Sequence, residues 1–183
     1  NCALIGNSSK GPFCLGGGMA GGTLNNCTLV GNSTDRYGGG AFGSTLNNCI
    51  LYFNTAQIDG ANYQDANLNY CCTTPLPPNG VGNIALDPML SSASHLSASS
   101  PCRGTGSAVC ATGTDIDGDL WGTPPSIGCD EYLAAAMNGP LSLEISTGWT
   151  NVAVGYLFGL KALIEGRASA SVWEFGDGTA ATN

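Results

Sequence analysis

Three carboxylates alternate with other residues in one short segment of the chain. They are Asp115, Asp117 and Asp119, separated by Ile116 and Gly118. Clustered carboxylate oxygens are the ligands that Ca²⁺ prefers, so the segment is a candidate calcium site. An EF-hand loop has its glycine directly after the third acid, whereas Gly118 precedes it here. The alternative is an acidic turn whose side chains hydrogen-bond the local backbone. Calcium is the only cofactor that the sequence suggests.

A pair of aspartates in the first half of the chain is the candidate for sugar chemistry. Hydrolysis of a glycosidic bond needs two carboxylates that face each other at about 5 to 10 Å. Asp35 and Asp59 are separated by slightly more than one of the repeats that this half contains, so they could approach if the repeats stack on one another. The alternative is that both are solvated charges in loops. The sequence contains no convincing catalytic constellation, and we do not expect an enzyme.

The nine cysteines of the chain show no zinc-binding pattern. No two of them are separated by two residues, and His95, the single histidine, has no nearby partner in the sequence. Structural zinc sites usually combine cysteine and histidine at short spacings. We therefore predict no zinc site.

A disulfide is predicted in the irregular stretch that contains the last three cysteines. Such a stretch gains stability from a covalent link if the compartment is oxidising. We predict that Cys102 is bonded to Cys129. The connectivity stays open, because Cys110 has two further candidate partners, Cys72 and Cys14.

Two segments that precede these residues are nearly identical and follow each other at a fixed interval. Residues 38–49 (GGGAFGSTLNNC) repeat residues 16–27 (GGGMAGGTLNNC). A fixed period of this length is typical of solenoids and other repeat arrays. The apolar runs within each repeat are short and are bounded by glycine and asparagine, which indicates strands rather than helices. The sequence therefore predicts an all-β fold that begins as a right-handed parallel β-helix of about 22 residues per coil.

Stacked coils would place equivalent side chains above one another, one strand spacing of roughly 4.8 Å apart. Small apolar thiols would line the interior. This cysteine ladder comprises Cys2, Cys27, Cys49 and Cys71. Asparagines would form a second ladder at turns, each bonding its neighbours above and below. The asparagine ladder comprises Asn7, Asn32 and Asn54. The interval from Cys2 to Cys27 is longer than the period, which predicts a short insertion near residues 11–13.

The pattern changes twice along the chain. Residues 1–132 are predicted to be the β-helix with its closing segment, and residues 133–140 a linker. Apolar and polar residues alternate from Leu141 onward, which predicts an antiparallel sandwich over residues 141–183.

Composition narrows the possible partners. The net charge is −8 and only five residues are basic, which argues against nucleic-acid binding. No long, uninterrupted apolar run occurs, so no membrane span is predicted. Charged residues make up only 10% of the chain. A β-solenoid of this composition, rich in glycine, asparagine, serine and threonine, suits an extracellular surface.

The repeats resemble those of bacterial secreted parallel β-helix proteins of the polymorphic outer-membrane-protein or choice-of-anchor type. The resemblance is carried by residues 26–33 (NCTLVGNS), by the motif GGGA, and by the closing segment that ends at residues 126–131 (SIGCDE). Residues 173–178 (WEFGDG) resemble the signature of a PKD domain, an immunoglobulin-like module. A complete sandwich of this kind takes about 100 residues, so residues 141–183 would be its N-terminal half. The resemblance implies an extracellular protein and no single activity.

These observations lead to two functional hypotheses. The first is an extracellular structural or adhesive module whose uncovered strand edges self-associate, with unlike ends meeting head to tail in a filament. The second is a β-helix protein that binds or cleaves polysaccharide. The expected partners are therefore further copies of the chain or carbohydrate.

Overall fold

The computed structural model describes residues 1–133, 142–147, 151, 153–155, 159–165, 172–174 and 178–182. Contacts between Cα atoms divide the chain into two compact units, Asn1–Tyr132 and Leu133–Asn183. Every regular element within the described residues is a β-strand. These residues include no apolar helix of membrane-spanning length.

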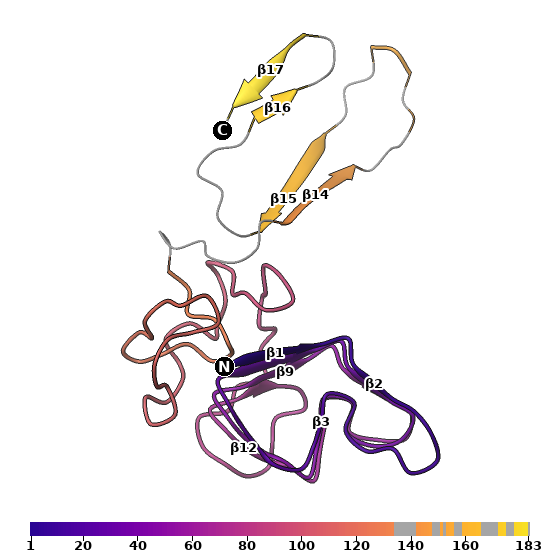
Figure 1. Cartoon of the computed structure of the whole chain (residues 1–183), viewed down its shortest axis with the longest axis vertical. Coiled ribbons are helices and arrows are strands. Elements are labelled where there is room, and N and C mark those ends of the chain that lie inside the picture. Colours follow the sequence, from indigo (N-terminus) through magenta and orange to yellow (C-terminus); the bar gives the residue numbers. More distant parts are fainter. Residues whose placement is uncertain are drawn as a thin grey trace. The chain divides into compact units, whose positions relative to one another are not determined.

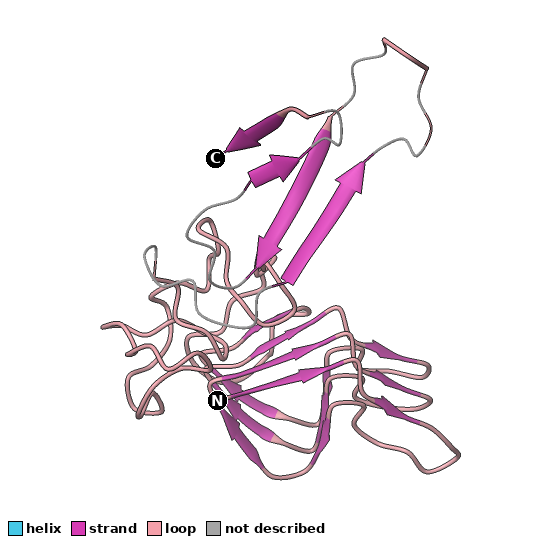
Figure 2. Ribbon diagram, turned by 45° about the horizontal axis from the view of Figure 1, so that its top comes forward, coloured by secondary structure: helices cyan, strands magenta, loops and turns pink. Residues whose placement is uncertain are grey.

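The first unit begins as a parallel β-solenoid of about three turns, which overlie one another in Figure 1 and are seen as stacked rows of strands in Figure 2. The first turn contains β1 (Cys2–Ile5), β2 (Ser8–Ser9), β3 (Met19–Ala20) and β4 (Thr23–Asn25). The second contains β5 (Cys27–Val30), β6 (Ser33–Thr34), β7 (Ala41–Phe42) and β8 (Thr45–Asn47). The third contains β9 (Ile50–Tyr52), β10 (Thr55–Ala56), β11 (Tyr63–Gln64) and β12 (Asn67–Asn69), and β13 (Cys72–Thr73) follows.

Four parallel sheets run along the stack, in the strand orders β1-β5-β9-β13, β10-β6-β2, β11-β7-β3 and β12-β8-β4. The register confirms the predicted length of a turn, since Leu24 pairs with Leu46 and Leu46 with Leu68. Between β2 and β6 the offset is longer, because Ser8 pairs with Ser33. The extra residues therefore lie between β2 and β3, in the region where the sequence predicts an insertion. The right-handed sense of winding stays a prediction.

The interior of the stack contains three members of the predicted cysteine ladder, and the fourth, Cys2, is exposed at its first turn. Cys2 pairs with Cys27 across β1 and β5, and Cys27, Cys49 and Cys71 share one buried cluster. Each of these last three thiols donates to the carbonyl oxygen two residues before it, at 3.2 to 3.3 Å. Burial raises the pKa of Cys49 well above its ordinary value. Cys27, Cys49 and Cys71 therefore serve as small core residues, whereas Cys2 does not.

A ladder of asparagine side chains runs beside the cysteines. Asn32 Oδ1 accepts hydrogen bonds from the backbone N and the Nδ2 of Asn7, at 2.9 and 3.0 Å. Its Nδ2 donates to Leu4 O at 2.8 Å and to Asn54 Oδ1 at 3.0 Å. One carboxamide thus satisfies groups of the turns above and below it, and Asn32 is fully buried. Asn54 makes the same four kinds of contact, with Asn62 as its next partner.

The last rung of this ladder comes from a position that the period does not predict. A strict step of one repeat from Asn54 leads to Leu76, which is exposed. Asn62, which is much closer to Asn54 along the chain, is buried instead. Its Oδ1 accepts from the backbone N and the Nδ2 of Asn54, at 3.2 and 3.1 Å. The Nδ2 of Asn62 donates to Thr74 O at 2.8 Å. The ladder therefore ends with its buried polar groups paired.

The closing segment, residues 84–132, consists of turns and isolated bridges. It packs on the outer face of the β1-β5-β9-β13 sheet, where Ile50 and Cys72 are completely buried in a cluster with Ile127. Cys129 N donates to Thr28 Oγ1 at 3.1 Å, which joins the segment to β5. The closing segment thus covers a sheet face that would otherwise be exposed.

The second unit contains two antiparallel strand pairs. β14 (Ser142–Thr147) pairs with β15 (Leu160–Glu165), and β16 (Val172–Glu174) pairs with β17 (Ala180–Thr182). Antiparallel strands are thus present, as the alternating sequence predicts. The assignment to a PKD sandwich stays a prediction, because residues 175–177 of its signature lie outside the described residues. The predicted linker lies outside them as well, apart from Leu133.

We predict that the substitution Asn32→Ala destabilises the solenoid far more than Asn47→Ala. Asn47 belongs to an outward row, in which its Nδ2 donates to Asn25 Oδ1 at 2.9 Å near solvent. Loss of the buried Asn32 carboxamide leaves Leu4 O and the Asn7 backbone N unsatisfied, which we expect to cost about 3 kcal/mol, against under about 1 kcal/mol at Asn47. Urea unfolding of both variants measures the difference, and equal effects would contradict the ladder's role.

We also predict that Gly39→Ala disrupts the stack at the bend before β7. A Cβ at Gly39 would lie 2.3 Å from the carbonyl oxygens of both Ala61 and Thr55. Gly21 is the matched control, since it has a φ of +70° but no atom within 4 Å of its Cβ position. Thermal unfolding should show a loss of about 3 kcal/mol for Gly39→Ala and about 1 kcal/mol for Gly21→Ala. A Gly39→Ala variant as stable as the parent would mean that the coils are spaced differently.

Candidate functional site

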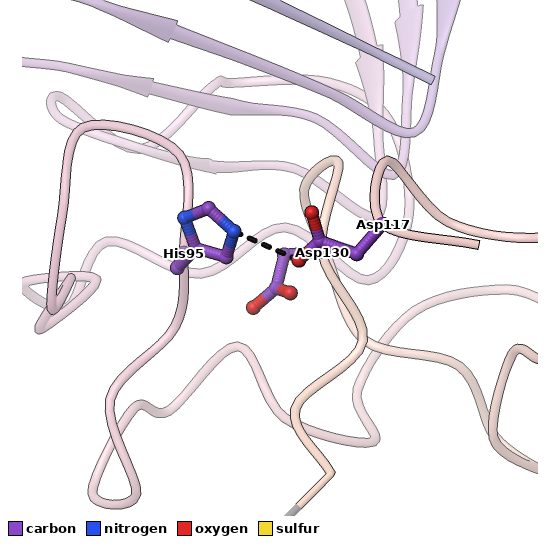
Figure 3. Close-up of side chains that lie close together, drawn as sticks. All are labelled: His95, Asp117 and Asp130. Carbon is purple, nitrogen blue, oxygen red and sulfur yellow. Dashed lines mark hydrogen bonds and ion pairs between the residues drawn. The ribbon is translucent and has the colours of Figure 1, made fainter. Parts of the chain in front are cut away.

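The described residues bring three possible ligands together in the closing segment. They are His95, Asp117 and Asp130, and one ligand atom of each lies within 4.8 Å of the others. Figure 3 shows the His95 ring beside both carboxylates, with the three residues coming from three separate stretches of chain. His95 Nε2 is 2.8 Å from Asp117 Oδ2. This group of one imidazole and two carboxylates is the candidate functional site.

A tight serine-rich turn sets the orientation of His95. The turn is closed by a bond from Ser91 N to His95 O at 2.9 Å. Ser92 Oγ accepts from the backbone N of both Ser94 and His95, a local pattern that serine favours. The hydroxyls of Ser92 and Ser94 lie 2.8 and 2.9 Å from His95 Nδ1. The imidazole is therefore held from one side, and its Nε2 faces the carboxylates.

Asp115 shapes the loop that carries Asp117. Its Oδ1 accepts from the backbone N of Asp117 and Asp119, at 2.8 and 2.9 Å, and its Oδ2 accepts from Glu131 N at 2.9 Å. Both oxygens of this buried carboxylate therefore bind backbone amides. Asp117 is the one member of the predicted calcium set that takes part in the cluster of ligand atoms found in the described residues.

Asp130 is the most deeply buried of the three ligands, with 6% of its surface exposed. Its Oδ2 accepts from Leu96 N at 2.8 Å. Burial raises the pKa of Asp130 to about 6, with smaller contributions from the nearby charges of Asp115 and Asp117, while the bond from Leu96 N and the charge of His95 act in the opposite direction. Two carboxylates and one imidazole thus share a confined space with excess negative charge.

Sequence reasoning missed this site because its members are far apart along the chain. His95 and Asp117 are 22 residues apart, and Asp130 lies further on, near the end of the closing segment. His95 has no candidate partner close to it in the sequence, but in the structure Asp117 lies against its ring. The sequence does place all three residues in the closing segment. Their spacing, however, matches no metal-binding motif.

The predicted disulfide is absent, since all nine cysteines are free thiols. Cys102 lies against Cys72 and Ile127 in a buried cluster, whereas Cys129 donates its thiol hydrogen to Ser94 O. A hydrogen bond with the Cys102 thiol raises the pKa of Cys72, and burial adds to the effect. The two cysteines of the predicted pair therefore have different neighbours, because the segment folds around Ile127.

The candidate carboxylate pair for sugar cleavage has structural partners instead. Asp35 Oδ2 accepts from Gly11 N and its Oδ1 from Gln57 Nε2, both at 3.0 Å. Asp59 Oδ1 accepts from Gly60 N at 2.7 Å, and the residue that pairs with Asp59 across the stack is Tyr37. The two aspartates therefore hold turns in place.

The outer face of the β12-β8-β4 sheet is a second surface of interest. Side chains on these strands alternate, with Leu24, Leu46 and Leu68 packed against or within the core. The outward positions form two rows along the stack, Thr23, Thr45, Asn67 and Asn25, Asn47, Asn69. No charged residue occurs on the three strands. The face therefore presents only hydroxyl and carboxamide groups.

A shallow groove lies at the end of this face. It has a volume of about 150 Å³ and is lined by residues 66–69 and 77–80. The lining contains proline, glycine, asparagine, alanine and leucine, and no titratable side chain. Enclosed small-molecule sites are usually about 300 Å³ or larger. The groove is therefore suited to a segment of an extended ligand.

Comparison of the chain with protein families, with curated proteins and with solved structures finds no match.

We predict that alkylation under native conditions separates the cysteines by burial. Burial raises the pKa of Cys129 to about 12, so its reactive thiolate is scarce at pH 8. Iodoacetamide should label the exposed Cys2 within minutes and leave Cys102 and Cys129 unmodified, as read by mass spectrometry. After denaturation without reductant, Cys102 and Cys129 should label fully. Failure to label in that state would show instead that Cys102 and Cys129 form the disulfide predicted from the sequence.

Proposed function

We propose that the chain is an adhesive β-solenoid module of an extracellular protein, and that the outer face of β12-β8-β4 binds neutral carbohydrate. The observation that carries the proposal is the pair of uncharged rows on this face. Carboxamide and hydroxyl groups both donate and accept hydrogen bonds, as sugar hydroxyls do. A repeating row at strand spacing offers the same contacts to successive parts of a polymer.

The groove beside β12 extends this surface. Asn67 and Asn69 belong both to the outward rows and to the lining of the groove. Pro77 and Pro78 also line the groove and add apolar surface, against which the apolar side of a sugar ring can pack. The small volume of the groove favours contact with one part of a long chain over enclosure of a free sugar.

Binding without cleavage is favoured by the placement of the carboxylates. Asp35 and Asp59 are engaged in turns, and the acidic residues of the closing segment do not lie on the three strands of this face. The low content of charged residues is compatible with an extracellular location.

Self-association through strand edges is the second form of adhesion that we propose. β10 and β11 each pair on one side only within the described residues, since they end the sheets β10-β6-β2 and β11-β7-β3. Such edges offer unpaired backbone groups to another strand. Each of these strands has only two residues, so the contact area would be small, and carbohydrate binding is the better supported proposal.

We predict that the double variant Asn25→Ala, Asn47→Ala loses binding to neutral polysaccharides. Affinity electrophoresis in gels containing soluble glucan, xylan or mannan should show retardation of the parent protein and at least a tenfold weaker interaction for the variant. The matched control is Ser8→Ala with Ser33→Ala, because these side chains form a similar outward pair, at 3.1 Å, on another sheet. The control should bind like the parent.

Two outcomes would overturn the carbohydrate proposal. One is the absence of retardation in all three gels, and the other is an equal loss of binding in both double variants. Sedimentation velocity on the same samples tests self-association, since concentration-dependent oligomers would support the second form of adhesion. New reducing ends released from the polymers would show instead that the chain is a hydrolase.

A further inference from the structure

We propose that His95, Asp117 and Asp130 form a binding site for a zinc-class divalent cation that holds the loops of the closing segment together. The proposal is independent of carbohydrate binding, because the three residues lie in the closing segment and not on the β12-β8-β4 face. It rests on the convergence of one imidazole nitrogen and two carboxylate oxygens within 4.8 Å of one another.

The distances suit a small cation. In zinc sites the metal lies about 2.0 to 2.2 Å from nitrogen and oxygen ligands, so tetrahedral ligands are about 3.4 Å from each other. The present spacing runs from 2.8 Å between His95 Nε2 and Asp117 Oδ2 up to at most 4.8 Å. Adjustments of about an ångström, mostly in side chains, would place all three atoms around one ion. The ion would take the place of the hydrogen bond between His95 Nε2 and Asp117 Oδ2.

The ligand types favour zinc over calcium. Calcium takes six to eight oxygen ligands, and nitrogen is not among its preferred donors. Imidazole together with carboxylate is typical of zinc and related transition metals. Three protein ligands leave a fourth position for water, and His95, with 24% of its side chain exposed, provides access from solvent.

His95 and Asp130 are each oriented by a hydrogen bond to a neighbouring group, as metal ligands in proteins usually are. The hydroxyls of Ser92 and Ser94 lie at hydrogen-bonding distance from His95 Nδ1. A proton on Nδ1 donated to either hydroxyl leaves the Nε2 lone pair free for a metal. Leu96 N donates to Asp130 Oδ2. His95 and Asp130 are therefore held in place by hydrogen bonds even without a cation.

The charges of the three side chains are a second reason to expect a bound cation. Asp130 has 6% of its surface exposed. Within the described residues, its carboxylate accepts one hydrogen bond, from Leu96 N. Within the same residues, His95–Asp117 is the one ion pair. One buried and one half-buried carboxylate beside a single imidazole are poorly compensated, and a divalent cation removes this imbalance. The bound ion would link three loops that have few backbone hydrogen bonds of their own.

The test uses the full chain, freed of metal by chelator and returned to chelator-free buffer at pH 7.5. His95 is the only histidine, so the imidazole signals in a long-range ¹H–¹⁵N spectrum come from this residue alone. One equivalent of ZnCl₂ should shift its Nε2 resonance and raise the melting temperature by about 5 °C. An equal concentration of CaCl₂ should leave both unchanged.

Two variants distinguish ligands from neighbours. Asp117→Asn removes a ligand but can still hydrogen-bond the imidazole, and calorimetry should show zinc affinity at least about 100-fold weaker. Asp119→Asn is the matched control from the same loop, outside the cluster of ligand atoms, and should bind zinc like the parent. If Asp117→Asn does not fold, the imidazole titration of the parent protein decides the question by itself.

Three results would overturn the proposal. An unchanged imidazole spectrum at one equivalent of zinc would show that any bound zinc is held elsewhere, for example by the exposed thiol of Cys2. Equal losses of affinity in Asp117→Asn and Asp119→Asn would indicate nonspecific attraction by the acidic loop. Binding of calcium that Asp119→Asn abolishes would support the calcium loop predicted from the sequence.

Discussion

The buried asparagine ladder is the interaction on which the rest of the solenoid depends. A chain that turns inside a stack leaves backbone carbonyls such as Leu4 O directed at the interior, where an unpaired polar group is expensive. A carboxamide carries two donors and two acceptor sites, so Asn32 and Asn54 each satisfy the turn above and the turn below. Asn62 ends the series by the same chemistry from a different position in the chain. This requirement keeps successive turns in register, and the leucine and cysteine rows then pack as a consequence.

The closing segment depends on that register in turn. It lies on a sheet face that is regular only because the coils are stacked, and it anchors there through Ile127 and the bond from Cys129 N to Thr28 Oγ1. The anchored segment consists of turns and isolated bridges, and side chains hold its loops. Asp115 binds three backbone amides, and His95 meets its carboxylate partner across two loops. The candidate cation site is therefore a product of loop packing on a rigid surface.

The two proposed activities use different parts of one unit. The β12-β8-β4 face is flat, repetitive and uncharged, which suits a polymer with repeating hydroxyl groups. The closing segment contains the buried carboxylates Asp115, Asp130 and Glu131, and it brings His95, Asp117 and Asp130 together, which suits a small cation. In the coils, Asp35 and Asp59 hold turns in place.

The sequence by itself determined the coils, because a repeat of like residues at a fixed period can bury its apolar faces only by stacking like on like. It also indicated the cysteine ladder, three rungs of the asparagine ladder, the insertion near residues 11–13 and the antiparallel strands of the second unit. Only the tertiary structure decided that Asn62 ends the ladder, that Cys102 lies beside Cys72, and that His95 meets Asp117 and Asp130. These contacts arise where the repeated sequence of the coils ends. Without a repeat, neighbours are set by how irregular loops pack on the finished sheet, and that information is spread over the whole unit.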